Sequence, residues 1–338
     1  MDFKRETRPM EKKSRYVVIA LGVIIALLIA GYAYTLLYRP TPLKRISIGT
    51  AAIGGGYYPI GVGVAQVISK YVPDVSAVAE ATGGSIENMR LLSEGRISIG
   101  FSNNIIAMMA FRGEEPFEKS MKDLRALFVI GTADTYHNIV TLENSGINTI
   151  KDIKGKRISV GAPGSAANIM ARLILKIHGV EPEDVTMAYL GWADAMTALK
   201  DGRIDVAYVL SAVPRSSAVY ELSTTHRIKL VPVDPEAVER AVKEGWLFSV
   251  GYIKAGTYIG VDVDVPCAMT GSTAFVRADF PEDLAYQIVK AVNEHIPEID
   301  RIAPGFKKSF KLITSPDFFI PVHPGAVKYA KELGVWKE

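Results

Sequence analysis

The 338-residue chain has very little of the chemistry that a redox or metal-binding protein needs. Its single cysteine, Cys267, excludes an internal disulfide, a CxxC redox pair and a cysteine zinc cluster. Its five histidines are scattered, and no two of them stand at the i, i+4 spacing. The sequence therefore does not indicate a histidine metal site. A composition of 49% hydrophobic and 22% charged residues is typical of a globular protein and excludes a disordered or fibrous chain.

The main part of the chain also lacks an excess of positive charge. Residues 1–43 hold seven Lys or Arg and three acids, a net charge of +4, whereas the whole chain carries +3. Residues 44–338 therefore carry −1, which is 3 minus 4. Without a broad cationic surface, nucleic acid is not an expected partner.

Charge is missing altogether from residues 16–38, YVVIALGVIIALLIAGYAYTLLY. A helix of this length, at about 1.5 Å per residue, spans the roughly 30 Å hydrocarbon layer of a membrane. Six Lys or Arg precede the segment, so the positive-inside rule predicts a single-pass protein of the cell membrane. Residues 1–15 would be a cytoplasmic tail, and residues 44–338 would be extracytoplasmic. The alternative is a signal peptide cleaved at Gly31-Tyr32-Ala33, which also exports the main part; we favour the uncleaved anchor.

Residues 44–338 contain an internal repeat. KRISIG at 44–49 recurs as KRISVG at 156–161, and DVS at 74–76 recurs as DVT at 184–186. GRIS at 95–98 recurs as GRID at 202–205. Three matches in the same order, at offsets of 107 to 112, indicate a duplicated unit.

Each copy has the alternating pattern of an α/β fold, in which strands and helices follow one another and predict parallel strand pairing. After the KRIS strand, the expected elements of the two copies are helices 58–71 and 166–178, strands 75–80 and 185–190, helices 85–93 and 193–200, and strands 97–101 and 204–210. We interpret them as two βαβαβ domains. One large doubly wound sheet is the alternative.

The rest of the chain suggests how the two domains connect. Residues 250–260 and 261–266 are expected to be loops, 268–276 a strand, and 281–295 an amphipathic helix. We expect the chain to cross to the second domain near residues 134–140 and to return near 268–276. Domain 1 would then consist of residues 44–136 and 268–338, and domain 2 of residues 137–267. Two crossings make a hinge, which suits closure around a ligand.

Four glycine-containing loops, at residues 53–59, 81–85, 161–165 and 190–193, follow expected strands and open expected helices. A helix start has unpaired N–H groups and about half a positive charge, and glycine lets a ligand approach that backbone closely. Ligands of parallel sheets bind beyond the carboxyl ends of the strands. The four loops therefore predict an anion site made of backbone, with Gly55, Gly56, Gly84 and Gly164 in its loops and Tyr57, Tyr58 and Trp192 as walls. Alternatively, each loop is only a tight turn, with Ser85 and Ser165 as plain N-caps.

Enzyme motifs are not recognisable. GGGYYP is not GxGxxG, GKR at 155–157 lacks the rest of a phosphate-binding P-loop, and no GxSxG elbow occurs. Asp262 and Asp264 alternate with valines as in a solvated edge, and Cys267 lies in an apolar stretch typical of a core position. We expect no enzyme, no catalytic residue, no metal and no cofactor.

Taken together, several segments resemble a known family. They are KRISIGT, GGGYYP, TGGSIENMRLL, KGKRISVGAPGSA, YLGWADAMTALKDGRIDV, AVPRSS, AGTYIGVDVDVP and PVHPGAVKYAKELG. Their order is similar to that of the TAXI solute receptors of TRAP (tripartite ATP-independent periplasmic) transporters. The resemblance implies a type II periplasmic-binding-protein fold with a ligand cleft between two domains. It also implies a receptor without catalysis, which delivers glutamate, glutamine or a dicarboxylate to TRAP permease subunits driven by an ion gradient.

The resemblance also implies ligand-contacting positions. They are Gly56, Tyr57, Thr82, Gly84, Ser85, Asn103, Asn104, Ser165, Trp192 and the turn that contains Val213. Arg215 is an additional cation beside this turn, and it could pair with a ligand carboxylate through two hydrogen bonds.

Three functions are compatible with these observations. The leading hypothesis is a membrane-tethered receptor for a small carboxylate. The second is a sensor module that signals a bound ligand to a membrane partner. The third is an extracellular α/β enzyme, which the missing nucleophile and metal motifs disfavour.

Overall fold

The computed structural model describes residues 21–29, 44–53, 56–163, 165–211 and 215–338. Residues 44–338 form one compact unit, and residues 1–43 form a separate one. The side chains of residues 132–134 are not described.

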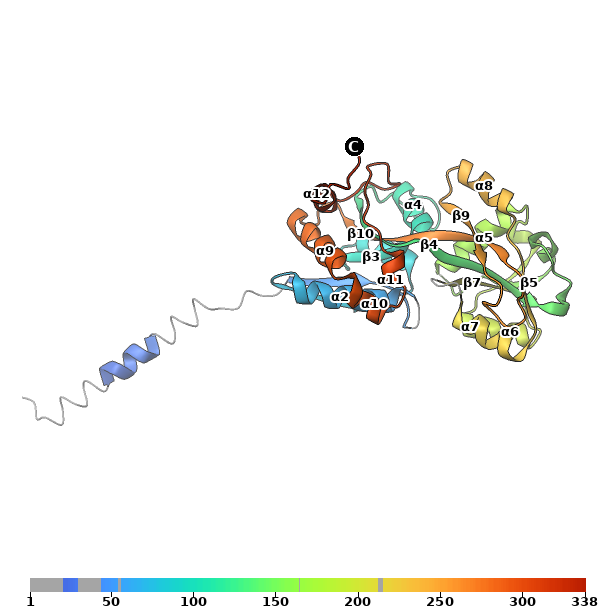
Figure 1. Ribbon diagram of the computed structural model, residues 1–338, viewed down its shortest axis with the longest axis horizontal. Helices are drawn as coiled ribbons and strands as arrows, with labels where there is room; N and C mark the ends of the chain where they lie inside the picture. Colours follow the sequence, from blue (N-terminus) through green and yellow to red (C-terminus); the bar gives the residue numbers. More distant parts are fainter. Residues whose placement is uncertain (1–20, 30–43, 54–55, 164, 212–214) are drawn as a thin grey trace, which may run out of the picture. The chain divides into compact units, whose positions relative to one another are not determined.

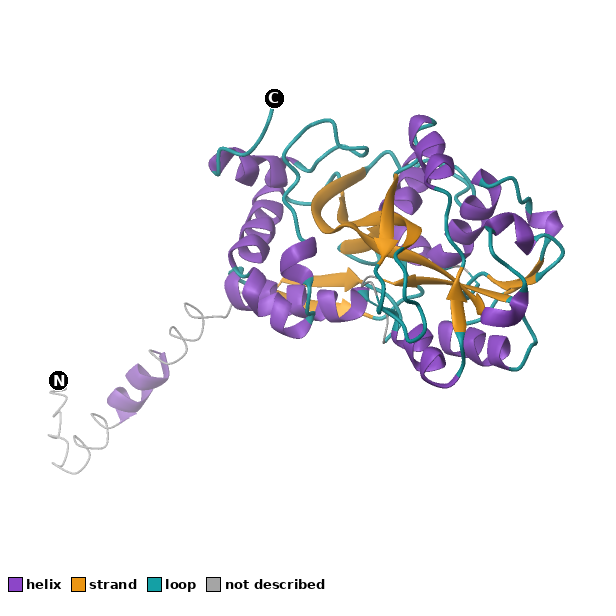
Figure 2. Ribbon diagram, turned by 45° about the vertical axis from the view of Figure 1, so that its right-hand side comes forward, coloured by secondary structure: helices purple, strands orange, loops and turns teal. Residues whose placement is uncertain are grey.

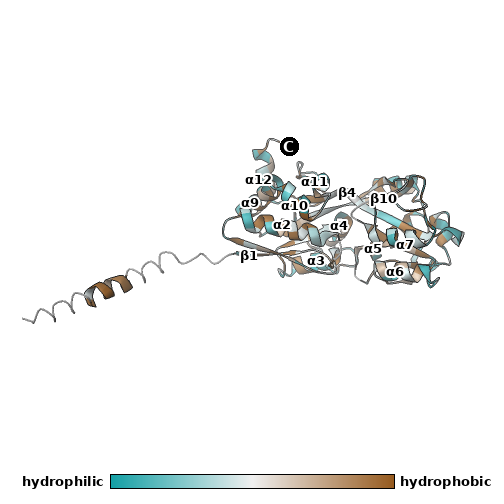
Figure 3. Ribbon diagram, turned by 60° about the horizontal axis from the view of Figure 1, so that its bottom comes forward, coloured by the Kyte–Doolittle hydropathy of each residue, from teal (hydrophilic) through white to brown (hydrophobic). Residues whose placement is uncertain are grey.

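The described part of the N-terminal unit is a helix of residues 21–29. Its residues are apolar (Figure 3), and its large side chains are exposed. Most of the segment for which a membrane span is predicted, residues 16–38, lies outside the described residues. Within the described ranges, no helix has both the length and the apolar character that a bilayer-spanning helix requires.

The first half of the sheet is built from β1 (Lys44–Gly49), β2 (Val75–Glu80) and β3 (Ile99–Asn103). β1 lies between the other two strands and runs parallel to both. The connecting helices are α2 (Tyr57–Tyr71) and α3 (Ser85–Ser93), and α4 (Asn104–Arg112) follows β3 directly. α3 has the predicted bounds, and α2 begins one residue before the predicted helix.

The second half of the sheet repeats this arrangement. β5 (Arg157–Ser159) lies between β6 (Thr186–Ala188) and β7 (Val206–Ser211) and is parallel to both. α5 (Ala166–Ile177) and α6 (Trp192–Lys200) are the connecting helices. The same order and the same pairing appear in both halves, as the repeated motifs predict.

Two long antiparallel strands, β4 (Leu124–Leu142) and β10 (Val265–Arg277), connect the halves (Figure 1). β10 pairs with β3 of the first half, and β4 pairs with β7 of the second half, both antiparallel. The strand order is β2-β1-β3-β10-β4-β7-β5-β6, which is one continuous sheet. The two boundaries predicted between the domains, at residues 136/137 and 267/268, fall inside these two strands and stay predictions.

Helices cover both faces of the sheet (Figure 2). The packing of the strand β7 shows which helix lies on each face. Its alternate residues Val206, Tyr208 and Leu210 pack in the same core as α5, whereas Ala207 and Val209 pack in the same core as α6. Because side chains of a strand alternate between its two faces, α5 and α6 lie on opposite faces. All six residues of β7 are buried, as expected for a strand covered on both sides.

The remaining elements complete the two ends of the sheet. They are the short 3₁₀ helices Glu143–Ser145, Ile150–Ile153 and Pro182–Asp184, the strands β8 (Ile228–Leu230) and β9 (Phe248–Ile253), and the helices α7 (Ser217–Thr225), α8 (Pro235–Lys243), α9 (Glu282–Glu294), α10 (Ile296–Ile302), α11 (Phe306–Ser309) and α12 (Pro324–Glu332). The loop predicted from residue 250 is wrong for residues 250–253. These residues belong to β9, which pairs antiparallel with β10. The pairing partner comes from 12 to 22 residues further along the chain, so a local pattern did not reveal this strand.

Candidate functional site

A cavity of about 500 Å³ lies beyond the carboxyl ends of the parallel strands, and all four glycine-containing loops line it. The first loop contributes residues 51–53, 56 and 57, and the second contributes residues 83–85. The third contributes residues 162, 163 and 165–167, and the fourth contributes residues 191–193. Asn103, Thr135 and Leu210 complete the lining from β3, β4 and β7. The structure therefore brings together the loops that the two repeated units place in equivalent positions.

Four helices begin at this cavity. Both the N-cap and the first helical residue of α2, α3, α5 and α6 line it. None of these four N-caps accepts a hydrogen bond from its own helix through a side chain. Among helices that begin elsewhere, α8 and α12 are capped by the side chains of Asp234 and His323, whereas α7 and α9 have no side-chain cap. The cavity thus receives backbone N–H groups that no cap occupies, together with the positive ends of four helix dipoles.

Charged side chains are absent from the lining that the structure describes. The polar groups there are the side chains of Tyr57, Ser85, Asn103, Thr135, Ser165 and Trp192, and the remaining lining residues are small or apolar. Positive potential in this cavity therefore comes from backbone dipoles, as the loop pattern predicts.

Tyr57 forms part of the cavity wall, and both its hydroxyl and its ring make contacts inside the protein. Its hydroxyl lies 2.7 Å from Ser272 Oγ of β10, and its ring meets Phe101 edge to face at 6.2 Å. Tyr58, which was also predicted as a wall, does not line the cavity. Consecutive residues of a helix point in different directions, so only one of the two tyrosines faces the site.

The second loop is held by a buried asparagine of α3. Asn88 Nδ2 donates to the carbonyl oxygens of Thr50 and Phe101, at 2.7 and 2.8 Å, and Asn88 Oδ1 accepts from Thr82 Oγ1 at 2.7 Å. Thr82 Oγ1 in turn accepts from Gly84 N at 3.2 Å. Thr82 therefore positions the loop from behind and does not itself line the cavity.

The third loop contains a glycine that the fold requires. Gly161 has a φ of +90°, and a Cβ at this position would lie 2.6 Å from the Cβ of Ala167. Ser165 Oγ donates to the carbonyl oxygen of Ala162 at 2.7 Å. The Ser165 hydroxyl thus closes its own turn and leaves the N-terminus of α5 uncapped.

The two asparagines after β3 have different surroundings. Asn103 lines the cavity and caps α4, because its Oδ1 accepts from Ile105 N at 3.0 Å. Asn104 Oδ1 accepts from Thr273 Oγ1 at 2.8 Å, so this side chain is directed to β10 and is not part of the lining. Arg215 is exposed and stacks over the ring of Tyr220 at 4.3 Å, and it does not line the cavity either.

Seven of the predicted ligand-contacting residues line the cavity: Gly56, Tyr57, Gly84, Ser85, Asn103, Ser165 and Trp192. Tyr58, Thr82, Asn104 and Arg215 are described but lie outside the lining, and Gly55, Gly164 and Val213 lie outside the described residues. Sequence reasoning missed Thr135 and Leu210. Thr135 lies on β4, a strand that no local pattern predicted, and Leu210 has no polar signal.

Behind the cavity wall, β4 carries a histidine that is 1% exposed, His137. Burial without a carboxylate partner lowers the pKa of His137 to about 3, so this imidazole is neutral in the folded protein at ordinary pH. Its neighbour Tyr208 is equally buried, and burial raises the pKa of that hydroxyl.

We expect His137 to make the protein less stable in mild acid. The folded state keeps this histidine neutral until about pH 3, whereas the unfolded chain protonates it below its ordinary pKa of about 6.5. The unfolded state therefore binds more protons as the pH falls, and the free energy of unfolding drops by about 2 kcal/mol between pH 6.5 and pH 5 from this group alone. Urea unfolding at several pH values, with wild type and His137→Gln, measures this effect. His178 and His323 are common to both proteins, so identical pH slopes would contradict the assignment.

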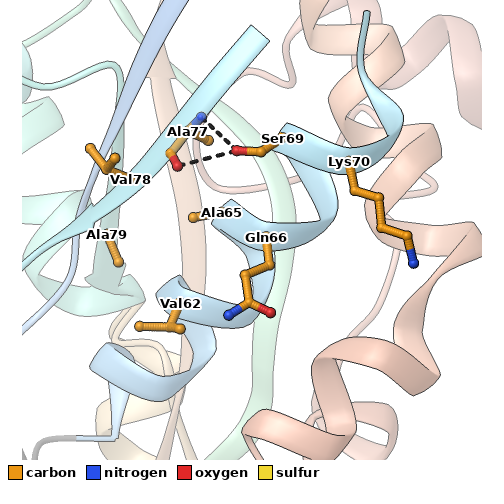
Figure 4. Close-up of a pocket in the computed structure, with 8 residues that line it drawn as sticks. All are labelled: Val62, Ala65, Gln66, Ser69, Lys70, Ala77, Val78 and Ala79. Atoms are coloured by element: carbon orange, nitrogen blue, oxygen red, sulfur yellow. Dashed lines mark hydrogen bonds between the residues drawn. The ribbon is translucent and has the colours of Figure 1, made fainter.

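A second cavity, of about 490 Å³, lies between α2 and the edge strand β2 (Figure 4). Ser69 Oγ accepts from Ala77 N at 2.8 Å and donates to Ala77 O at 3.2 Å, whereas Lys70 points away. Ser69 thus satisfies backbone groups at the edge of the sheet. The lining is otherwise mostly Ala and Val, so this cavity lacks the convergent polar groups of the first.

In the part of the chain that the structure describes, no three His, Cys, Asp or Glu side chains are grouped so that they could hold a metal ion. The single cysteine, Cys267, is buried on β10, and burial raises the pKa of its thiol to about 12.

Comparisons with known proteins agree with this architecture. A model of the NMT1-like family matches residues 48–334. Among solved structures, PhnD1 from Prochlorococcus marinus in complex with methylphosphonate is 15% identical, with a TM-score of 0.51, over 87% of this chain and 98% of that one. XAC2383 from Xanthomonas citri bound to ATP is 12% identical, with a TM-score of 0.50, over 86% of this chain and 95% of that one. At these identities the likeness concerns the fold alone, which is mixed α/β and periplasmic-binding-protein-like.

Proposed function

The chain belongs to the NMT1-like family, and from this membership we propose that it is a solute-binding receptor that captures a small organic anion and delivers it to a membrane transporter. The observation that carries the proposal is the cavity where four uncapped helices begin. Its volume of about 500 Å³ is in the range of small-molecule sites.

An anion is the ligand that this cavity suits best. Each helix start carries about half a positive charge and has no side-chain cap on its first turn. Four of these starts converge where the described lining has no carboxylate to oppose them. Carboxylate oxygens accept several such donors at once, and the wall of Trp192, Tyr57 and small apolar residues can enclose a short carbon chain.

Further detail rests on the sequence resemblance. The TAXI-like segments favour glutamate, glutamine or a dicarboxylate as the ligand class and TRAP permease subunits as the partner. They also favour a type II binding protein that closes about a hinge. β4 and β10 are the candidate hinge strands, because they pair with each other, β10 pairs with β3 of the first half, and β4 pairs with β7 of the second half.

The uncharged segment of residues 16–38 is the basis for a separate proposal, that the protein is held at the cell membrane. If residues 16–38 anchor the chain, with residues 44–338 extracytoplasmic, the receptor stays near its permease. Tethering raises the effective concentration of a receptor at its partner without any new contact. Detection of the intact N-terminus in isolated membranes would distinguish an anchor from a cleaved signal.

The proposal is tested by titrating the protein with L-glutamate, L-glutamine, 2-oxoglutarate and succinate, followed by calorimetry and tryptophan fluorescence. We expect saturable binding of at least one anion, with a fluorescence change that comes from Trp192 at the cavity. The variant Trp192→Phe should lose most of this change. Trp246→Phe is the matched control, because Trp246 does not line the cavity and the variant should keep the signal. Absence of saturable binding to every anion would contradict the proposal.

A further inference from the structure

A row of buried polar side chains begins at the cavity and crosses the middle of the sheet. Asn103 Nδ2 donates to Thr270 Oγ1 at 2.7 Å, and Thr270 Oγ1 lies 3.2 Å from His137 Nε2. His137 Nδ1 lies 2.6 Å from the hydroxyl oxygen of Tyr208. All four side chains are at most 2% exposed. Of the four, only Asn103 lines the cavity.

The row follows the strands that join the two halves. Its members lie on β3, β10, β4 and β7, which are consecutive neighbours in the sheet. The ring of His137 is fixed further by edge-to-face contacts with Tyr208 and Phe248, at 5.7 and 5.8 Å between ring centres. The imidazole therefore has a defined orientation between Thr270 and Tyr208.

The distances indicate where the proton of His137 is. Hydrogen bonds with an O–H donor are shorter than those with an N–H donor. By this criterion we assign the 2.6 Å contact to the Tyr208 hydroxyl donating to Nδ1, and the 3.2 Å contact to Nε2–H donating to Thr270 Oγ1. Thr270 Oγ1 then accepts from both His137 and Asn103.

This arrangement determines what Asn103 offers to the cavity. Its Oδ1 is occupied by Ile105 N, so its amide cannot be flipped without losing the cap of α4. One Nδ2 hydrogen goes to Thr270, and the described residues supply no acceptor for the second. Asn103 lines the cavity, so this second N–H is a candidate donor to a ligand.

We propose that Thr270, His137 and Tyr208 are positioning residues, which hold the Asn103 amide so that it donates one hydrogen bond to the bound anion. The inference rests on the proposed function of the cavity, but it assigns a role to three residues that do not touch the ligand. An unoriented amide would present its oxygen to an anion as readily as its nitrogen. The α4 cap holds Oδ1, and the row supplies an acceptor for one Nδ2 hydrogen, so the two together fix the amide.

The first test uses the ligand-free protein. Nitrogen-15 NMR of histidine-labelled wild type reports the tautomer of His137. We expect a neutral ring with the proton on Nε2 from pH 5 to pH 8. A proton on Nδ1, or a cationic ring, would overturn the proposed direction of the row.

The second test measures whether removal of the Tyr208 hydroxyl changes the surroundings of the Asn103 side-chain amide. Tyr208→Phe removes one hydroxyl, and it should shift both the His137 signals and the side-chain amide signals of Asn103. Tyr329→Phe is the matched control, because Tyr329 is equally buried but its hydroxyl bonds only to Asn293 among the described contacts. If the Asn103 amide signals are the same in Tyr208→Phe and in wild type, Tyr208 is no positioning residue.

The third test measures binding of the anion that wild type binds best in the panel above. Thr270→Val, which keeps the shape but lacks the acceptor, should weaken the affinity about ten-fold, and Thr270→Ser should restore most of it. Equal affinity of Thr270→Val and wild type would overturn the role in binding. If wild type binds no anion, the proposed function fails, whereas the two NMR measurements still decide whether the row orients Asn103.

Discussion

Replacing Gly84 with alanine is expected to weaken anion binding about 100-fold, which corresponds to about 2.7 kcal/mol of binding free energy. Gly84 is the N-cap of α3 and has φ 99° and ψ −152°, a backbone conformation that is essentially restricted to glycine. An alanine must either keep this conformation, at a cost of about 1–3 kcal/mol, or rotate and turn the first N–H groups of α3 away from the cavity. If it keeps the conformation, its Cβ meets no atom of the described residues within 4 Å and stands beside the cavity lining, of which Gly84 is part.

The control for this prediction is Gly305→Ala. Gly305 also has a positive φ, 101°, with open space where a Cβ would stand, but it does not line the cavity. We expect Gly305→Ala to lose some stability and to keep wild-type affinity in calorimetry. A Gly84→Ala protein that is folded by circular dichroism and binds within three-fold of wild type would show that the start of α3 does not hold the ligand.

Replacing Asn88 with alanine is expected to lower the free energy of unfolding by about 3 kcal/mol or more. The fully buried side chain makes three hydrogen bonds, to Thr50 O, Phe101 O and Thr82 Oγ1. Its removal leaves two buried carbonyl oxygens and one hydroxyl without these partners, and each such loss costs about 1–3 kcal/mol. The change also releases the loop that contains Gly84, so the affinity for the anion should fall together with the free energy of unfolding. Urea unfolding measures the loss of stability as a lower midpoint at an unchanged slope.

Asn293→Ala is the comparison for Asn88→Ala. Among the described residues, Asn293 Nδ2 donates one hydrogen bond, to the hydroxyl of Tyr329 at 3.1 Å, and the side chain is only partly buried. We expect this variant to lose about 1 kcal/mol. A loss for Asn88→Ala that is no larger than the loss for Asn293→Ala would mean that the second loop is held mainly by other contacts.

Local sequence signals locate β1, α3 and their repeated counterparts in the chain. Their bounds follow from signals that lie within a few residues: an alternating strand, a glycine loop, and a helix with apolar residues three and four apart. The position of the site follows as well, because parallel strands place the loops after their carboxyl ends on one side of the sheet. Seven predicted contact residues consequently line one cavity.

Two predicted contact residues, Thr82 and Asn104, lie outside the cavity lining because their side chains bond within the protein. Thr82 and Asn104 have the hydroxyl and amide groups that a ligand site uses, but their partners are Asn88 and Thr273, inside the protein. A polar residue at the right end of a strand can face the ligand or support the loop behind it. The side-chain direction decides between these roles, and it is set by packing.

The order of residues along the chain determined the duplicated unit, the glycine-containing loops that open helices and the absence of charged residues from those loops. These features depend on residues that are neighbours in the chain. The structure decided that these helix starts have no side-chain cap. The long partnership of β4 with β10, the continuous sheet and the buried row from Asn103 to Tyr208 arose only on folding. They join positions far apart, such as Asn103 with Thr270 and His137 with Thr270, which are 167 and 133 residues apart. The cost of closing such distances is repaid by burial of the whole assembly, so no single stretch of the chain carries their signal.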